Sequence, residues 1–193
     1  MGKLVLFVCV FNRGRSVASE YILRKMLKER DEKLASQIEV ASAGLVLERD
    51  AEWLKGFGLE LPENPFGKPP YRNMTTIMHK RGIDISSHRS RELTTPLAEE
   101  ADLIIISEED PPYRKNAITN SWPSARDKTF TFREFVEAIA EGEYLATEDP
   151  NALPYADDEF IDFSPEYLEA CVTEIEEHLS LRMDKFINYL QLG

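Results

Sequence analysis

The chain has 193 residues, of which 42% are hydrophobic, and a formal net charge of −12. This length and composition are typical of one globular domain and exclude a disordered chain. The acidic surface repels nucleic acid and anionic membranes, so we expect neither as a partner.

The first predicted elements are a buried strand and a helix. Residues 4–8 form an unbroken apolar run, typical of a strand covered on both faces in a parallel sheet. Beyond Ser16, apolar residues recur at every fourth position from Ala18, which predicts an amphipathic helix. Glu20 and Arg24 are spaced as an ion pair on the polar side of that helix. The chain therefore opens as a strand, a tight loop and a helix.

Further strands and helices alternate along the chain, at residues 38–41, 75–80, 103–106, 129–132 and 133–140. Ser164 followed by Pro165 is typical of a helix N-cap and first turn, and predicts a long final helix. This alternation favours a three-layer α/β/α sandwich with a mostly parallel four-stranded sheet. We expect a single domain over residues 1–193, with an irregular excursion rich in proline and glycine around residues 50–72.

Cys9 and Cys171 are too few for a disulfide framework or a four-cysteine zinc site. The apolar run at residues 4–11 is too short to span a membrane, and no cleavage pattern of small residues follows it. We therefore expect a soluble, cytoplasmic protein in a reducing compartment.

The loop between the first strand and the first helix predicts an anion site. In an open α/β sheet, ligands bind at the carboxyl ends of strands, and a helix N-terminus presents unpaired N–H groups to an anion. The guanidinium of Arg15 can bind two phosphate oxygens at once, and Arg13 adds further positive charge nearby. The residues expected to surround a phosphate are Val10, Phe11, Asn12, Arg13, Gly14, Arg15 and Ser16.

Cys9 ends the first strand and would face the phosphorus of a bound phosphate. Five residues separate it from Arg15, and Ser16 follows as the helix begins. A helix N-terminus and neighbouring arginines favour the thiolate form of a cysteine, so Cys9 is expected to be a nucleophile at neutral pH. Ser16 could donate a hydrogen bond to the sulfur and stabilise it as an anion or leaving group.

The motif C-x5-R-S after an N-terminal strand resembles the low-molecular-weight protein tyrosine phosphatases. C-x5-R alone is weakly specific, but other segments of the chain are similar to the family's and follow the same order. These segments are residues 42–44 (S-A-G), 82–84 (G-I-D), 87–91 (S-H-R-S-R), 101–104 (A-D-L-I) and 148–150 (E-D-P).

The resemblance implies a phosphatase that hydrolyses phosphate monoesters without a metal or organic cofactor. Its substrate would be a phosphorylated protein, carrying phosphotyrosine, or a small phosphate ester. Cys9 would attack phosphorus and form a phosphocysteine, and Arg15 would bind the equatorial oxygens. Asp149 would protonate the leaving oxygen and then activate the water that hydrolyses the intermediate. The residues that would hold the phosphate loop are Asn12, Ser16, Ser42 and His88.

Some positions depart from the family's pattern and leave alternatives open. Phe11 stands where the family usually has glycine, and Asn151 and Ala152 replace aromatic residues that line the pocket. Asp149 also has rivals for the role of the acid. The candidates for a replacement pocket wall are Trp53, Phe57 and Tyr155, and the rival acids are Asp110, Asp157 and Asp158.

Two other functions compete with the phosphatase. An arsenate reductase would need further thiols to resolve an oxidised intermediate. Cys171 lies on the apolar stripe of the last helix and is expected to be a core residue instead. A non-catalytic phosphate-binding module would need neither Cys9 nor Asp149. The joint presence of these two residues therefore favours the enzyme.

Overall fold

The computed structural model describes residues 2–107, 113–139, 154–156 and 161–191. Its centre is a four-stranded sheet with the strand order β2-β1-β3-β4, and every neighbouring pair is parallel. The strands are β1 (Lys3–Cys9), β2 (Ile38–Gly44), β3 (Leu103–Ile106) and β4 (Thr129–Thr131).

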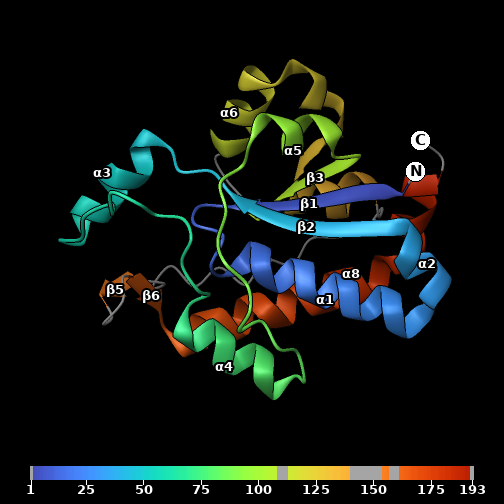
Figure 1. Cartoon of the computed structure of the whole chain (residues 1–193), viewed down its shortest axis with the longest axis horizontal. Coiled ribbons are helices and arrows are strands. Elements are labelled where there is room, and N and C mark those ends of the chain that lie inside the picture. The colour runs from blue at the N-terminus through green and yellow to red at the C-terminus, as the bar shows by residue number, and fades with distance from the viewer. Residues whose placement is uncertain (1, 108–112, 140–153, 157–160, 192–193) are drawn as a thin grey trace.

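Helices cover both faces of this sheet (Figure 1). One face carries α1 and α8, and α4 packs against α8. The other face carries α5, α6 and a 3₁₀ helix at Pro123–Lys128. The bounds are α1 (Arg15–Arg30), α4 (Arg72–Lys80), α5 (Thr95–Glu100), α6 (Tyr113–Ser121) and α8 (Pro165–Gln191). The predicted three-layer α/β/α sandwich is therefore confirmed.

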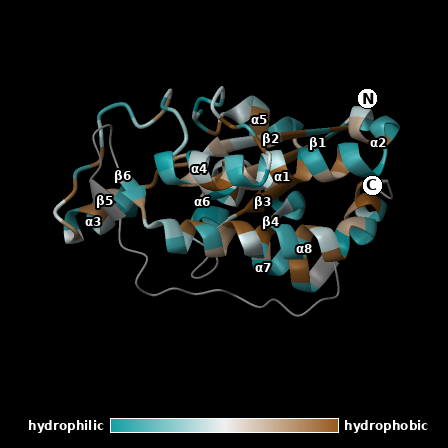
Figure 2. Ribbon diagram, turned by 90° about the horizontal axis from the view of Figure 1, so that it is seen from below, coloured by the Kyte–Doolittle hydropathy of each residue, from teal (hydrophilic) through white to brown (hydrophobic). Residues whose placement is uncertain are grey.

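The central strand β1 shows why its sequence is apolar without alternation. Successive side chains of a strand point to opposite faces of the sheet. Val5 and Phe7 pack into the layer of α1 and α8, while Leu6 and Val8 pack into the layer of α5. All four are fully buried. Figure 2 shows the same arrangement, with hydrophobic strands between helices that turn hydrophilic sides outward.

Shorter elements extend this core. They are α2 (Glu32–Gln37), α3 (Glu48–Gly56), α7 (Phe132–Glu134), a π-helical turn (Phe135–Ile139) and the antiparallel pair β5 (Pro154–Ala156) and β6 (Ile161–Phe163). Helix α3 and the β5–β6 pair lie at the same end of the molecule, beyond the carboxyl ends of the sheet strands (Figures 1 and 2). Among the described residues, no helix combines the length and the hydrophobicity that a membrane span requires.

The structure differs from the sequence-based expectations in a few elements. Residues 48–56, at the start of the predicted irregular excursion, form α3, whereas residues 57–71 contain neither helix nor strand. Phe132 begins α7 instead of ending a strand, because the Thr131 and Glu134 side chains form a capping box there. Helices α2, α5 and α6 were not predicted, and each has nine residues or fewer.

Candidate active site

The loop from Cys9 to Arg15 joins β1 to α1 at the carboxyl edge of the sheet. Cys9 lies beside Gly44 of β2 in the parallel register. A Cβ atom on Gly44 would lie 2.7 Å from the carbonyl oxygen of Val10, so only glycine lets the loop pass this close to β2. The Sγ atom of Cys9 is 3.0 Å from the Oγ atom of Ser16, at the start of α1.

Asn12 organises the loop from a buried position. Its φ angle is 54°, in the left-handed region that asparagine tolerates better than most residues. Its side-chain amide donates to Ser16 Oγ at 3.0 Å and to Ser42 Oγ at 2.7 Å. Its Oδ1 atom accepts from the backbone N–H of Arg91 at 3.0 Å and lies 3.1 Å from His88 Nε2. Every hydrogen-bonding position of the Asn12 amide is therefore used.

Ser16 Oγ accepts a hydrogen from Asn12 and lies 3.0 Å from the sulfur, where either group can donate. When Cys9 is a thiolate it can only accept, and Ser16 is then the donor. Ser42 Oγ likewise accepts from Asn12 and donates to the carboxylate of Glu20. The structure thus brings together Asn12, Ser16, Ser42 and His88, the four residues predicted to hold the loop.

Glu20 extends this network, a contact that its position in the sequence did not predict. The predicted ion pair with Arg24 is present at 2.8 Å, but Glu20 is only 4% exposed and accepts a hydrogen bond from Ser42 of β2. Burial raises the pKa of Glu20, opposed by its hydrogen bond to Ser42 and by the charges of Arg24 and Arg91. Because Glu20 stands at a position where a polar residue is expected, the sequence gave no sign of its contact with Ser42.

Burial also acts on His88, and chiefly lowers its pKa. The hydrogen bond to Asn12 opposes this shift, whereas the charges of nearby arginines add to it. The ring's Nε2 atom lies 3.2 Å from the Asn12 carbonyl oxygen and 3.1 Å from its Oδ1 atom. Both atoms are acceptors, which assigns the hydrogen of the neutral ring to Nε2.

A cavity of about 220 Å³ opens above Cys9. Its floor comes from the loop, and its walls come from α3, the start of α4, and the β6–α8 junction. The lining residues are Cys9, Val10, Phe11, Gly14, Arg15, Arg49, Asp50, Trp53, Tyr71, Phe163, Tyr167 and Leu168. An anion-binding loop at the base of an aromatic pocket suits an aryl phosphate.

The aromatic wall is assembled from separate segments of the chain. Trp53 and Phe163 stack with ring centroids 6.5 Å apart and an interplanar angle of 17°. Tyr71 meets Phe163 edge-on at 5.4 Å, and Tyr167 packs against Phe163 at 5.7 Å. Of the residues considered for this wall, Trp53 lines the cavity. Phe57 packs instead on the edge of Trp53 at 5.2 Å.

Two contacts hold Phe163 in this wall. The side-chain amide of Asn73 donates to the carbonyl oxygen of Phe163 at 3.0 Å. The backbone N–H of Asn73 donates to the buried carboxylate of Asp162 at 3.2 Å. Both contacts tie β6 to the first turn of α4, beside Tyr71. Tyr71, Phe163 and Tyr167 were missed from the sequence because nothing local marks an aromatic residue as a pocket wall.

The two arginines of the loop occupy different surroundings. Arg15 lines the cavity. Arg13 is buried outside its lining, where its Nε–H donates to the carbonyl oxygen of Pro69 at 2.6 Å. The Arg13 guanidinium also lies 4.7 Å from the centre of the Tyr71 ring. The side chain of Arg13 therefore anchors the segment that carries Tyr71.

The remaining candidates fall into two groups. Asp149 and its rivals Asp110, Asp157 and Asp158 lie outside the described residues, as does Asn151. Cys171 is buried in α8, as expected of a core residue. Within the described part of the chain, no cluster of His, Cys, Asp or Glu side chains could hold a metal ion.

The chain is similar to a family of known enzymes. The family model described as low molecular weight phosphotyrosine protein phosphatase matches residues 62–188. The low molecular weight protein-tyrosine-phosphatase Ptp of Acinetobacter johnsonii is 25% identical over 178 residues, which cover 92% of this chain and 98% of that protein.

Solved structures share the fold. The low molecular weight protein tyrosine phosphatase from T. tengcongensis has a TM-score of 0.65 and 25% identity, covering 95% of this chain and 99% of that one. The YwlE arginine phosphatase from Geobacillus stearothermophilus has a TM-score of 0.63 and 23% identity, covering 98% of this chain and 94% of that one. Because the family model spans more than half of its residues, this chain belongs to the low molecular weight phosphotyrosine protein phosphatase family.

Proposed function

We propose that the protein hydrolyses phosphate monoesters, with phosphotyrosine in proteins as the substrate, through a phosphocysteine intermediate. The observation that carries the proposal is the position of the Cys9 sulfur. It lies at the base of an aromatic cavity, 3.0 Å from the Oγ atom of Ser16, which also accepts a hydrogen bond from Asn12. A donor in this position stabilises a thiolate as nucleophile and again as leaving group.

In the first step, the Cys9 thiolate attacks phosphorus and forms an S–P bond as the P–O bond to the leaving group breaks. Arg15 and the N–H groups at the start of α1 hold the phosphate oxygens. Asp149 donates a proton to the leaving oxygen, a contribution of roughly 10²–10⁴-fold for a positioned acid. In the second step, Asp149 accepts a proton from water as its oxygen attacks phosphorus. The S–P bond breaks, and inorganic phosphate and the Cys9 thiolate are released.

The walls of the cavity support an aryl ester as the substrate. Aromatic side chains attract a substrate ring by stacking and edge-on contacts, worth about 0.5–1.5 kcal/mol per pair beyond the buried area. Trp53, Tyr71 and Phe163 could each supply such a contact. The fold is shared with an arginine phosphatase, so phosphoarginine is the natural comparison substrate. We also propose the cytoplasm as the site of action, because the cytosol keeps cysteine thiols reduced.

The test compares wild type with two cysteine variants on p-nitrophenyl phosphate and a phosphotyrosine peptide. Cys9→Ser should lower kcat by at least about 10³-fold, since removing a nucleophile abolishes the covalent route. Cys171→Ser should retain most of the activity, because this buried residue lies outside the cavity lining. Wild-type rates in the Cys9 variant would refute the mechanism. Faster hydrolysis of phosphoarginine than of phosphotyrosine would refute the substrate.

A further inference from the structure

Arg49 places a second cation at the cavity that holds Cys9 and Arg15. It lies in the first turn of α3, is exposed, and lines the same cavity as those two residues. Helix α3 is anchored to α6, because Asp50 accepts two hydrogen bonds from the buried Arg114 at 2.8 Å each. Arg49 therefore sits on a fixed element at the rim of the site.

The guanidinium of Arg49 is held in place by an aromatic ring. It lies 3.4 Å from the centre of the Tyr113 ring, at the start of α6. A guanidinium stacked by its face keeps its N–H donors in its own plane, pointing away from the ring. Stacking thus restrains the side chain while leaving the donors available for a planar acceptor such as a carboxylate.

Nothing in the described part of the chain accepts a hydrogen bond from Arg49 or forms an ion pair with it. Asp50, its neighbour in the sequence and in the cavity lining, is engaged by Arg114. Other arginines of this acidic chain have partners, for example Arg24 with Glu20 and Arg81 with Glu169. A restrained arginine that has no acceptor among the described residues, beside a phosphate site, is suited to an anion supplied by the substrate.

We infer that Arg49 recognises a carboxylate next to the phosphorylated residue, so that the preferred substrates are phosphotyrosine peptides with acidic flanking residues. This inference rests on the proposed function and specifies its substrate class. In the complex, Arg15 binds the phosphate and Arg49 donates to the flanking Asp or Glu. Arg49 is a specificity-determining residue with no part in bond making or breaking.

The experiment measures kcat/KM for two phosphotyrosine peptides that differ only in their flanking residues, which are Glu in one and Gln in the other. Wild type should prefer the acidic peptide by about threefold to fivefold at low ionic strength, as for a partly exposed charge pair. The preference should fall toward one in 0.5 M salt, where screening acts over a few ångströms. Arg49→Gln should remove the preference. Tyr113→Phe should keep it, and Tyr113→Ala should reduce it.

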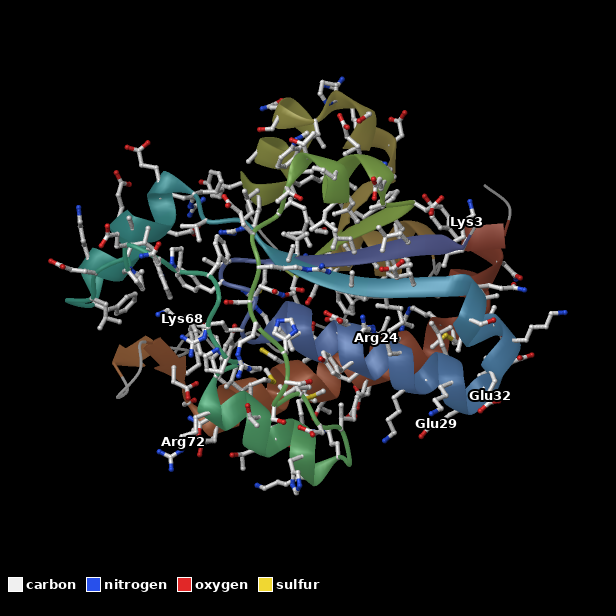
Figure 3. All side chains as sticks on the ribbon, in the orientation of Figure 1. Lys3, Arg24, Glu29, Glu32, Lys68 and Arg72 are labelled. Atoms are coloured by element: carbon white, nitrogen blue, oxygen red, sulfur yellow. The ribbon has the colours of Figure 1, made fainter. Side chains whose placement is uncertain are left out.

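Two control variants match the change of charge. Lys55 is exposed on the same helix, and Arg72 is exposed at the start of α4, at the same end of the molecule as α3 (Figure 3). Neither lines the cavity, so Lys55→Gln and Arg72→Gln should keep the wild-type preference. The inference about Arg49 would be overturned if wild type hydrolysed the two peptides at equal rates, or if a control variant lost the preference as fully as Arg49→Gln does. Hydrolysis of the neutral peptide would still uphold the proposed function. Failure of wild type to hydrolyse either peptide would overturn both.

Discussion

At the scale of single residues, the phosphate loop has two requirements at position 12. The backbone must be left-handed, and the side chain must both donate and accept hydrogen bonds. The backbone of Asn12 is left-handed, which glycine would accept with less strain. Its amide also donates to Ser16 and Ser42 and accepts from the Arg91 N–H, bonds that glycine could not make. Asparagine combines both properties. Its hydrogen bond to Ser16 also positions the hydroxyl that lies 3.0 Å from the Cys9 sulfur.

Arg15 is the residue whose geometry, more than its charge, should matter for catalysis. It lines the cavity, and its planar guanidinium can bind two phosphate oxygens at once. Arg15→Lys keeps the charge but loses this fork, so kcat/KM for p-nitrophenyl phosphate should fall by about 10²–10³-fold. Steady-state kinetics measure this loss. Near-wild-type values in the lysine variant would contradict bidentate binding of the phosphate.

At the scale of elements, a buried ion pair contributes to the position of α3. Arg114 of α6 is fully buried and meets Asp50 through two hydrogen bonds of 2.8 Å. Its Nε–H also donates to the carbonyl oxygen of Leu45, just beyond β2. Arg114 thus links α6, the end of β2 and α3. Because α3 carries Trp53 and Arg49, this link sets one wall of the cavity.

Removing Arg114 should therefore affect both stability and substrate binding. Arg114→Met leaves the carboxylate of Asp50 buried without its partner, and should lower the free energy of unfolding by about 3–5 kcal/mol. It should also raise KM more than it lowers kcat, because α3 lies at the wall and not at the reacting atoms. Urea denaturation and steady-state kinetics measure the two effects.

An exposed pair provides the control. Arg30 and Asp184 form an ion pair between α1 and α8, with both side chains largely in solvent. Arg30→Met should lower the free energy of unfolding by less than about 1 kcal/mol, as is usual for surface pairs. If the Arg30 and Arg114 variants lost the same stability, the assigned role of the buried pair would be wrong.

At the scale of the whole molecule, the network behind the phosphate loop links stability to pH. The pKa of His88 is lowered in the folded protein, so between its folded pKa and about 6.5 the unfolded chain binds a proton that the folded chain does not. His88 therefore contributes stability that is present above pH 6.5 and is lost as the pH falls through its folded pKa. Glu20 acts in the opposite sense, because its pKa is raised.

Equilibrium unfolding between pH 5 and pH 7.5 tests this linkage. The free energy of unfolding of wild type should fall relative to that of His88→Gln as the pH decreases below 6.5. The raised pKa of Glu20 adds stability as the pH falls through the folded pKa of that residue. Glu20→Gln should remove this contribution. His79→Gln, at an exposed position on α4, is the control and should follow wild type. A pH-independent difference between wild type and the His88 variant would refute the assignment.

The sequence by itself determined the sheet strands and the sandwich, and it predicted the loop from Cys9 to Ser16 as the anion site. These features depend on local patterns: an apolar run for a doubly covered strand, and a helix N-terminus directly after it. The structure places the predicted supports Asn12, Ser42 and His88 together, where they hydrogen-bond around this loop.

Only the tertiary structure decided what surrounds that loop. Tyr71, Phe163 and Tyr167 become a pocket wall because an irregular segment, β6 and α8 meet there. Glu20 is spaced like a residue on the solvent side of a helix, yet it is buried and accepts a hydrogen bond from Ser42 of β2. The physical reason is the same in each case. Helical or strand spacing fixes the face on which a side chain lies, whereas packing between distant segments determines what that face contacts.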